Sequence, residues 1–294
     1  MEKFQGFKVE NVNSELEAYS RELYNEFINS SVYQECLDDG FTNEEIYNNI
    51  GLFTDLKISR EKEALVKTYD DCLKYNIFYK LKIIRSGVGF DKVYDAIDPY
   101  KKYLRYVSAF IFKDFSHEFD TIDINKLDNK EAIKKIVLRL NKTRYVYIQG
   151  VRKSGKSYIS IAYVNAFIKK HQDKKVAYID CSKRFNEIND LYFKDKADFY
   201  DVLNRLCAVD LLVLDNFGSE AKNAYLRDNL VMPLIKSRFE KDKLTIINSS
   251  YKISTIGKFY ALKNEEVDKI VASELVELLK NNSEEIVISN VSLY

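Results

Sequence analysis

The spacing of apolar residues changes along the chain and predicts two structural parts. In the N-terminal third they recur every three or four positions, as at Leu16, Tyr19, Leu23 and Phe27, which indicates helices. Capping-box sequences at 14–17 and 42–45 predict two helix starts. A further helix is expected over 59–75, and Gly87 with Gly89 predicts a turn. This part is therefore expected to be mostly helical.

From residue 145 onward, short runs of apolar and β-branched residues alternate with longer helical patterns. This alternation is typical of a parallel sheet with helices on both faces. The expected strands cover 145–148, 176–179, 211–214, 244–247 and 286–288. The expected helices cover 156–170, 198–206, 225–239 and 267–279. The pattern predicts an α/β fold with a smaller, mostly helical N-terminal domain.

An acidic stretch with little periodicity lies between the two patterns. A helix is expected to open at Pro99 and to carry Leu104, Val107 and Phe110, and the acidic stretch follows it. We therefore expect a helical N-terminal domain over 1–112, a linker over 113–127 and an α/β domain over 128–294.

The segment from 150 to 157 reads G-V-R-K-S-G-K-S and matches the phosphate-binding loop G-x-x-x-x-G-K-[ST] at every position. It lies between an expected strand and an expected helix, as such a loop requires. Gly150, Ser154 and Gly155 belong to the loop, whose backbone N–H groups curl around phosphate oxygens. Lys156 is expected to reach the β- and γ-phosphates, and the Ser157 hydroxyl to bind Mg²⁺. The sequence thus predicts ATP with Mg²⁺ as ligands.

A second element of a nucleotide site follows the loop. Leu211-Leu212-Val213-Leu214-Asp215 is an apolar run that ends in an acid, which predicts Asp215 at the carboxyl end of a buried strand, where it can hold Mg²⁺. ATPases of this layout usually have another acid next, which orients the attacking water. Here that position is Asn216, whose amide can hydrogen-bond a water but cannot take its proton. Asp215 and Asn216 are the expected catalytic pair, with slow hydrolysis.

Composition narrows the function classes. The chain has 46 Lys+Arg against 45 Asp+Glu, so no overall charge forces a nucleic-acid or membrane partner. No apolar run approaches the length of a membrane span, and no secretory signal opens the chain, so a cytoplasmic protein without a membrane partner is expected. The cysteines are scattered and do not cluster with histidines. No zinc site is therefore expected, and the thiols are expected to be reduced and buried.

Asp215-Asn216-Phe217-Gly218-Ser219-Glu220, followed by Tyr225-Leu226-Arg227-Asp228, resembles the D-D-[IL]-G-A-E…W-V-R-D signature of bacterial primosomal helicase loaders of the DnaC/DnaI type. These loaders are AAA+ ATPases, and the likeness covers residues 120–260. It implies a P-loop AAA+ fold, an N-terminal domain that grips the helicase, and an ATP-binding domain over 128–294. The polar sensor residue that follows the fourth strand would be Ser250 or Asn248, and Ser250 is taken as a nucleotide contact.

The implied function is delivery of the replicative hexameric DNA helicase onto single-stranded DNA during replication initiation or restart. ATP would control self-assembly, with weak or partner-dependent hydrolysis. No arginine follows Arg238, so an arginine finger and a sensor arginine have no counterpart there. Arg227 and Arg238 are expected either to contact a neighbouring protomer or to pair with Asp228 and Glu240. Two alternatives remain: an IstB-like transposition ATPase, or a non-hydrolysing protein whose interactions depend on bound ATP.

Overall fold

The computed structural model describes residues 9–87, 89–123, 130–262 and 266–288. The described residues fall into two compact units, which divide between Arg105 and Tyr106. The elements of the first unit, in order, are α1 (Val9–Ile28), α2 (Ser31–Asp38), α3 (Asn43–Asn48), α4 (Ile50–Ala64), α5 (Tyr69–Tyr75), β1 (Tyr79–Ser86) and β2 (Gly89–Ala96). The division falls within α6 (Asp98–Ser108).

The first unit packs its helices around an aromatic centre that includes Phe27, Phe41 and Phe53. The capping box at Thr42 and Glu45 is present and starts α3, as predicted. The prediction at Ser14 is wrong, because α1 already runs from Val9. The single helix expected over 59–75 is two helices, since α4 ends at Ala64 and a second capping box, at Thr68 and Asp71, starts α5.

A two-stranded antiparallel hairpin, β1 with β2, joins these helices. The expected turn at Gly87 and Gly89 connects its strands. The unit is therefore less helical than the sequence predicts. The hairpin was not predicted because its charged residues alternate with apolar ones, and among its described apolar side chains only Leu81 and Ile83 are buried in the core.

The second unit is a sheet between two helical layers. Its remaining elements are β3 (Phe110–Lys113), a 3₁₀ turn η1 (His117–Phe119), α7 (Lys130–Thr143), β4 (Tyr145–Gln149), α8 (Lys156–Lys170), β5 (Val176–Asp180), α9 (Cys181–Lys194), α10 (Lys196–Ala208), β6 (Leu211–Phe217), α11 (Ala224–Leu226), a π-helical turn η3 (Arg227–Val231), α12 (Met232–Glu240), β7 (Leu244–Ser249), α13 (Ile253–Tyr260), α14 (Glu266–Asn282) and β8 (Glu284–Val287).

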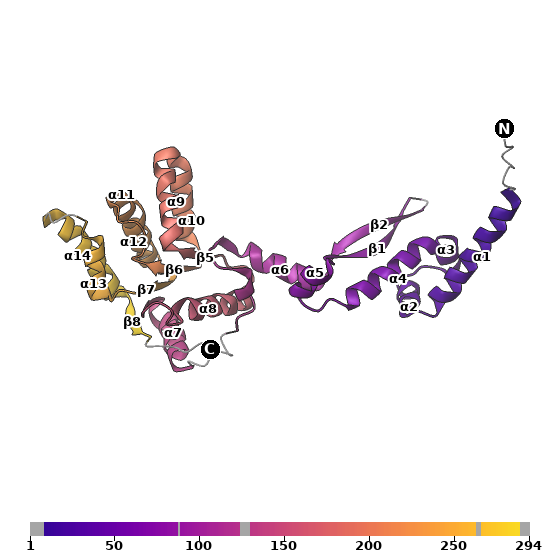
Figure 1. The fold of residues 1–294 in the computed structure, drawn as a ribbon, viewed down its shortest axis with the longest axis horizontal. Helices are drawn as coiled ribbons and strands as arrows, with labels where there is room; N and C mark the ends of the chain where they lie inside the picture. Colours follow the sequence, from indigo (N-terminus) through magenta and orange to yellow (C-terminus); the bar gives the residue numbers. More distant parts are fainter. Residues whose placement is uncertain (1–8, 88, 124–129, 263–265, 289–294) are drawn as a thin grey trace, which may run out of the picture. The chain divides into compact units, whose positions relative to one another are not determined.

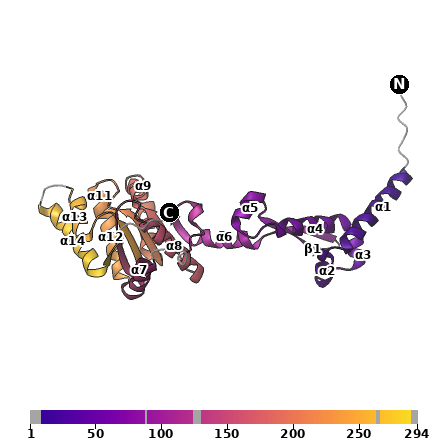
Figure 2. The ribbon, with the colours of Figure 1, turned by 60° about the horizontal axis from the view of Figure 1, so that its bottom comes forward.

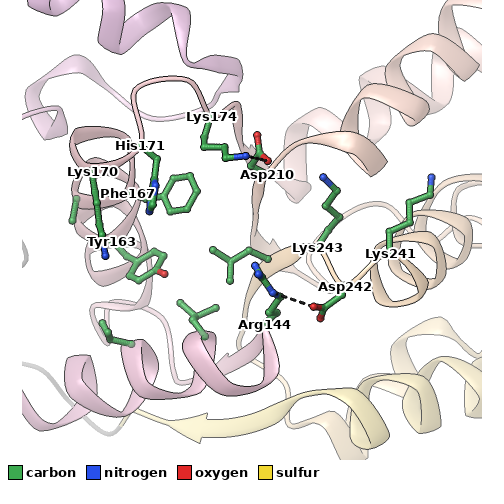
Figure 3. A pocket seen from close by; sticks show the side chains of 14 residues that line it. Arg144, Tyr163, Phe167, Lys170, His171, Lys174, Asp210, Lys241, Asp242 and Lys243 are labelled. Carbon is green, nitrogen blue, oxygen red and sulfur yellow. Dashed lines mark ion pairs between the residues drawn. The ribbon is translucent and has the colours of Figure 1, made fainter.

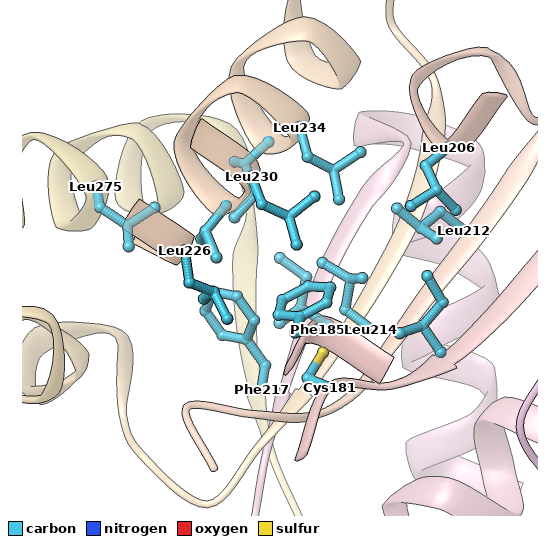
Figure 4. Packing of buried hydrophobic residues seen from close by; sticks show 14 of the residues in the cluster. Cys181, Phe185, Leu206, Leu212, Leu214, Phe217, Leu226, Leu230, Leu234 and Leu275 are labelled. Atoms are coloured by element: carbon cyan, nitrogen blue, oxygen red, sulfur yellow. The ribbon is translucent and has the colours of Figure 1, made fainter. Parts of the chain in front are cut away.

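Within the described residues, six strands form one parallel sheet in the order β3-β5-β6-β7-β4-β8. Strand residues alternate between two cores, because successive side chains point to opposite faces. α7 and α8 cover one face, and α9, α10 and α12–α14 cover the other (Figures 1 and 2). Figure 4 shows the second core, where Phe185, Leu214 and Leu230 interdigitate. The expected α/β sheet is confirmed.

β3 is an edge strand that the sequence reading missed. Val107 to Phe110 looked like a continuing helix, but Phe110 and Lys113 pair with β5 instead. The sheet therefore begins before residue 113, and the second unit already begins at Tyr106. This division differs from the expected 1–112 domain and 113–127 linker, of which residues 124–127 lie outside the described part.

The four cysteines are free and buried, as expected. Every helix in the described ranges is too short or too polar to cross a lipid bilayer.

Candidate nucleotide-binding site

The predicted phosphate loop connects β4 to α8 at the carboxyl edge of the sheet. Gly155 caps α8 with a left-handed φ of 91°, which glycine adopts without strain. At Gly150 a Cβ atom would lie 2.5 Å from Ser154 Oγ and 2.8 Å from the carbonyl oxygen of Ile288. Only glycine fits at position 150, so the loop is tightly cradled by its own residues and by the end of β8.

Gly150→Ala should distort this loop. Its Cβ overlaps a backbone carbonyl, so we expect a destabilisation of about 1–3 kcal/mol and weaker ATP binding. Thermal unfolding and titration with a fluorescent ATP analogue would measure both. Gly51→Ala is the matched control, because a Cβ at Gly51 meets open space. Equal ATP affinity in the wild type and the Gly150→Ala protein would contradict the cradle.

Lys156 is buried, and its ammonium folds back on the loop. Nζ donates to the carbonyl oxygens of Gly150 at 2.7 Å and Val151 at 2.9 Å, and lies 3.4 Å from Ser154 Oγ. Burial lowers the pKa of Lys156, and the nearby Asp215 carboxylate partly opposes this. The hydrogen-bond partners of the Lys156 ammonium are thus neutral and do not balance its buried positive charge. An anionic ligand at the loop would balance this charge.

Asp215 lies at the centre of a hydrogen-bonded cluster at the same carboxyl edge of the sheet as the phosphate loop. Its Oδ1 accepts from Ser157 Oγ at 3.0 Å and from Asn248 Nδ2 at 3.0 Å, and its Oδ2 accepts from Tyr178 at 2.8 Å. Ser160 Oγ in turn donates to Asn248 Oδ1 at 3.0 Å. The structure thus brings the two expected metal-binding residues, Ser157 and Asp215, into direct contact.

The other two predicted residues lie outside this cluster. Asn216 is exposed, has a left-handed φ of 56°, and donates from Nδ2 to Asp180 Oδ1 at 3.0 Å. Ser250 is exposed just beyond β7, and its backbone carbonyl accepts from the Gln149 amide at 3.3 Å. Of the two candidates for the sensor position, Asn248 is the one that contacts Asp215.

Two further polar residues of the site, Tyr178 and Asp180 on β5, were not predicted from the sequence. A signal for Asp180 was present: the strand Val176–Asp180 is an apolar run that ends in an acid, like the run that ends at Asp215. The register of the sheet places Asp180 directly beside Asp215. Burial is the main cause that raises the pKa of Tyr178 well above its ordinary value, and the negative charge of Asp215 raises it further. The Tyr178 hydroxyl therefore stays protonated and remains a hydrogen-bond donor.

Glu220, the nearest carboxylate downstream of Asn216, lies in the interior. It accepts from the backbone N–H of Gly218 at 2.8 Å and from the hydroxyl of Tyr260. Burial raises the pKa of Glu220, partly opposed by these hydrogen bonds. Its contacts bind the turn after β6 to α13, so its role in the structure is packing of that turn.

Glu220 makes the stability depend on pH. The pKa of Glu220 in the folded state lies above the usual 4.5, so its carboxyl group ionises at lower pH in the unfolded chain than in the folded one. The stability that the protonated Glu220 contributes is therefore present at acid pH and is lost as pH rises through the folded-state pKa. Glu220→Gln loses one acceptor and should cost about 1–2 kcal/mol at acid pH. This deficit should narrow as pH rises, as measured by melting curves across the acid-to-neutral range. The exposed Glu240→Gln is the control, and a Glu220→Gln deficit that stays constant would contradict the assignment.

Arg227 and Arg238 are both internal. Arg227 binds Asp228 and Asp268 at 2.6 Å each and the carbonyl of Tyr260 at 2.9 Å. Arg238 is fully buried and donates to backbone carbonyls rather than to Glu240. The expected Asp228 pair is present, and neither arginine is exposed to a neighbouring protomer.

A separate hollow of about 800 Å³ lies at the opposite, amino edge of the sheet (Figure 3). Its basic residues are Arg144, Lys170, Lys174, Lys241 and Lys243. Arg144 pairs with Asp242 at 3.1 Å and Lys174 with Asp210 at 3.3 Å. These two acids also line the hollow, so they partly neutralise its positive charge. It shares no residue with the phosphate loop.

The comparisons with known proteins bear on the fold. No protein-family model and no curated protein sequence matches the chain. The crystal structure of DnaI aligns with a TM-score of 0.53 and 19% identity, over 62% of this chain and 98% of that one.

Two further solved structures align at lower scores. The crystal structure of the DnaC helicase loader has a TM-score of 0.46 and 18% identity, over 59% of this chain and 100% of that one. The structure of AMPPCP-bound DnaA from Aquifex aeolicus has a TM-score of 0.47 and 14% identity, over 60% of this chain and 52% of that one. The chain has the AAA+ fold, and it resembles the bacterial helicase loaders of the DnaC/DnaI type.

Proposed function

We propose that the chain is an ATP-binding helicase loader that delivers the replicative DNA helicase onto single-stranded DNA in the cytoplasm. The observation that carries this proposal is the Lys156 loop beside the Ser157–Asp215 contact, on a fold shared with DnaI. The DnaC/DnaI-type signature around Asp215 and Arg227 supports the same family of functions.

The residues present fit ATP and Mg²⁺. The backbone N–H groups at the start of α8 and the Lys156 ammonium would hold the phosphates, since both offer N–H donors to anionic oxygens. The oxygens of Ser157 and Asp215 are ligands that Mg²⁺ prefers, and Asn248 and Tyr178 hold the carboxylate in place. When bound, Mg²⁺ would neutralise charge on the phosphates.

The N-terminal unit would contact the helicase through α1. Phe27, near the end of this helix, is buried, whereas Leu16 and Tyr19 are 57% and 59% exposed. These two apolar side chains, near the middle of α1, are therefore not covered by the described part of the unit's own core. Such residues suit a protein partner better than solvent.

A pull-down of the replicative helicase from the same cell, with and without ATP, tests the proposal. We expect the full chain to capture the helicase and Leu16→Asp/Tyr19→Asp to lose it, while the control Tyr94→Asp, on exposed β2, retains it. Lys156→Ala should change only the response to ATP.

The same preparation should bind single-stranded DNA in preference to duplex in the presence of ATP. Absence of helicase capture in every nucleotide state would overturn the loader proposal. Capture of a transposase together with a preference for duplex DNA would favour the IstB-like alternative instead.

A further inference from the structure

The position that usually holds a second acid after Asp215 is connected to a carboxylate on the neighbouring strand. Asn216 Nδ2 donates to Asp180 Oδ1 at 3.0 Å, and Asp180 is the register partner of Asp215 across β5 and β6. The Asn216 amide on β6 is thus paired with the Asp180 carboxylate on β5, at the carboxyl edge of the sheet.

The backbone of β6 directs Asn216 toward this partner. The pairing of β6 with β7 shifts register between Leu214 and Phe217, which is the signature of a bulge. Bulges re-aim side chains, and the left-handed φ of 56° at Asn216 is one that Asn tolerates better than most residues. The amide side chain of Asn216 therefore points toward the neighbouring strand β5, where it contacts Asp180.

Described residues hold the Asp180 carboxylate through its Oδ1 atom. Its Oδ1 accepts from Asn216 Nδ2, from Ser182 Oγ at 2.7 Å and from the backbone N–H of Ser182 at 3.2 Å. Among the described residues, no hydrogen bond reaches its Oδ2. The backbone N–H of Asp180 is fixed in turn by Asp114 Oδ2 at 3.2 Å. The carboxylate is thus fixed in orientation through Oδ1, and no described residue bonds its second oxygen.

We propose that Asp180 supplies the carboxylate that Asn216 lacks, and that Asn216 positions it. The inference rests on the proposed ATP-binding function. The water oxygen forms a bond to the γ-phosphorus while its proton passes to Asp180 Oδ2. The bond from the γ-phosphorus to the bridging oxygen breaks, and ADP leaves with the electron pair. Asp180 then returns the proton to solvent. In this arrangement β5 supplies the carboxylate and β6 supplies the amide that positions it.

Asp180→Asn tests this role. Asn caps a helix about as well as Asp, so the start of α9 should be kept. General-base catalysis contributes roughly 10²–10⁴-fold, so kcat should fall at least about 100-fold with KM little changed. Affinity for a fluorescent ATP analogue should stay within about twofold. Protein recovered after incubation with ATP should carry ATP, whereas wild type should carry ADP.

The exchange variant Asp180→Asn/Asn216→Asp gives the decisive comparison, since it returns the acid to β6. It should recover turnover to within about tenfold of wild type, while Asn216→Asp alone should not exceed wild type by more than that.

Wild-type turnover in Asp180→Asn would overturn the assignment. Tight ATP binding by wild type, with no turnover above the Lys156→Ala background even with helicase and single-stranded DNA, would overturn it too, but leave the loader proposal standing. Absence of ATP binding by wild type would overturn the proposed function itself.

Discussion

Arg238→Met should lower the free energy of unfolding of the second unit by at least about 3 kcal/mol, because it leaves three buried backbone carbonyls without donors, at about 1 kcal/mol or more each. The guanidinium donates to the carbonyls of Leu206 at 2.7 Å, Val209 at 3.0 Å and Leu244 at 2.6 Å, and to Thr245 Oγ1 at 2.8 Å. Methionine fills similar space but leaves these acceptors without donors. Each unsatisfied buried acceptor costs about 1–3 kcal/mol.

The deficit should not vary across the neutral range. Burial lowers the pKa of Arg238 only to about 10, so the side chain stays protonated in both states below that pH. Peptide-resolved hydrogen exchange should show faster opening of β6 and β7, with α4 of the first unit unchanged. Arg144→Met is the matched control, because its pair with Asp242 is half exposed and such pairs contribute about 0–1 kcal/mol. Equal effects of the two substitutions would contradict the assigned role of Arg238.

Lys156→Ala should remove most of the stabilisation by ATP. A ligand at about 100 times its Kd stabilises a protein by about 2.7 kcal/mol. Losing a charged hydrogen bond of about 1.5–3 kcal/mol weakens binding roughly 10- to 100-fold, so the ATP-induced gain should fall by at least about 1.4 kcal/mol. Thermal shift with and without ATP measures it.

Without ATP the same substitution should change stability little, because it removes a poorly compensated buried charge as well as its hydrogen bonds. Lys170→Ala, at the exposed end of the same helix, should leave the ATP effect intact. A wild-type ATP shift in Lys156→Ala would place the nucleotide elsewhere.

The sequence predicted the second unit well where local pattern and tertiary role agree. The helix after the phosphate loop begins at Lys156 and ends at Lys170, as expected, because the glycine and the apolar face both mark it. It failed at Phe110–Lys113, where an apolar run suits a helix or a strand equally. Only pairing with β5, a long-range contact, decides between them.

The candidate site shows the same limit. The contact between Ser157 and Asp215 was predictable, since one residue ends a phosphate-loop motif and the other ends the apolar run of the strand beside it. Asp180 was not singled out, because an acid after a strand is common and strand adjacency is not written in the local sequence. The choice between Asn248 and Ser250 also required the register of β7.

Two residues of the loader signature meet on a single tyrosine. Glu220 accepts from the hydroxyl of Tyr260, and Arg227 donates to its backbone carbonyl. These two contacts, which we call the Tyr260 latch, connect α13 to the turn after β6. A relative could keep this latch intact and lose ATP turnover completely, so motif searches built on it would recognise the architecture of such proteins and not their activity.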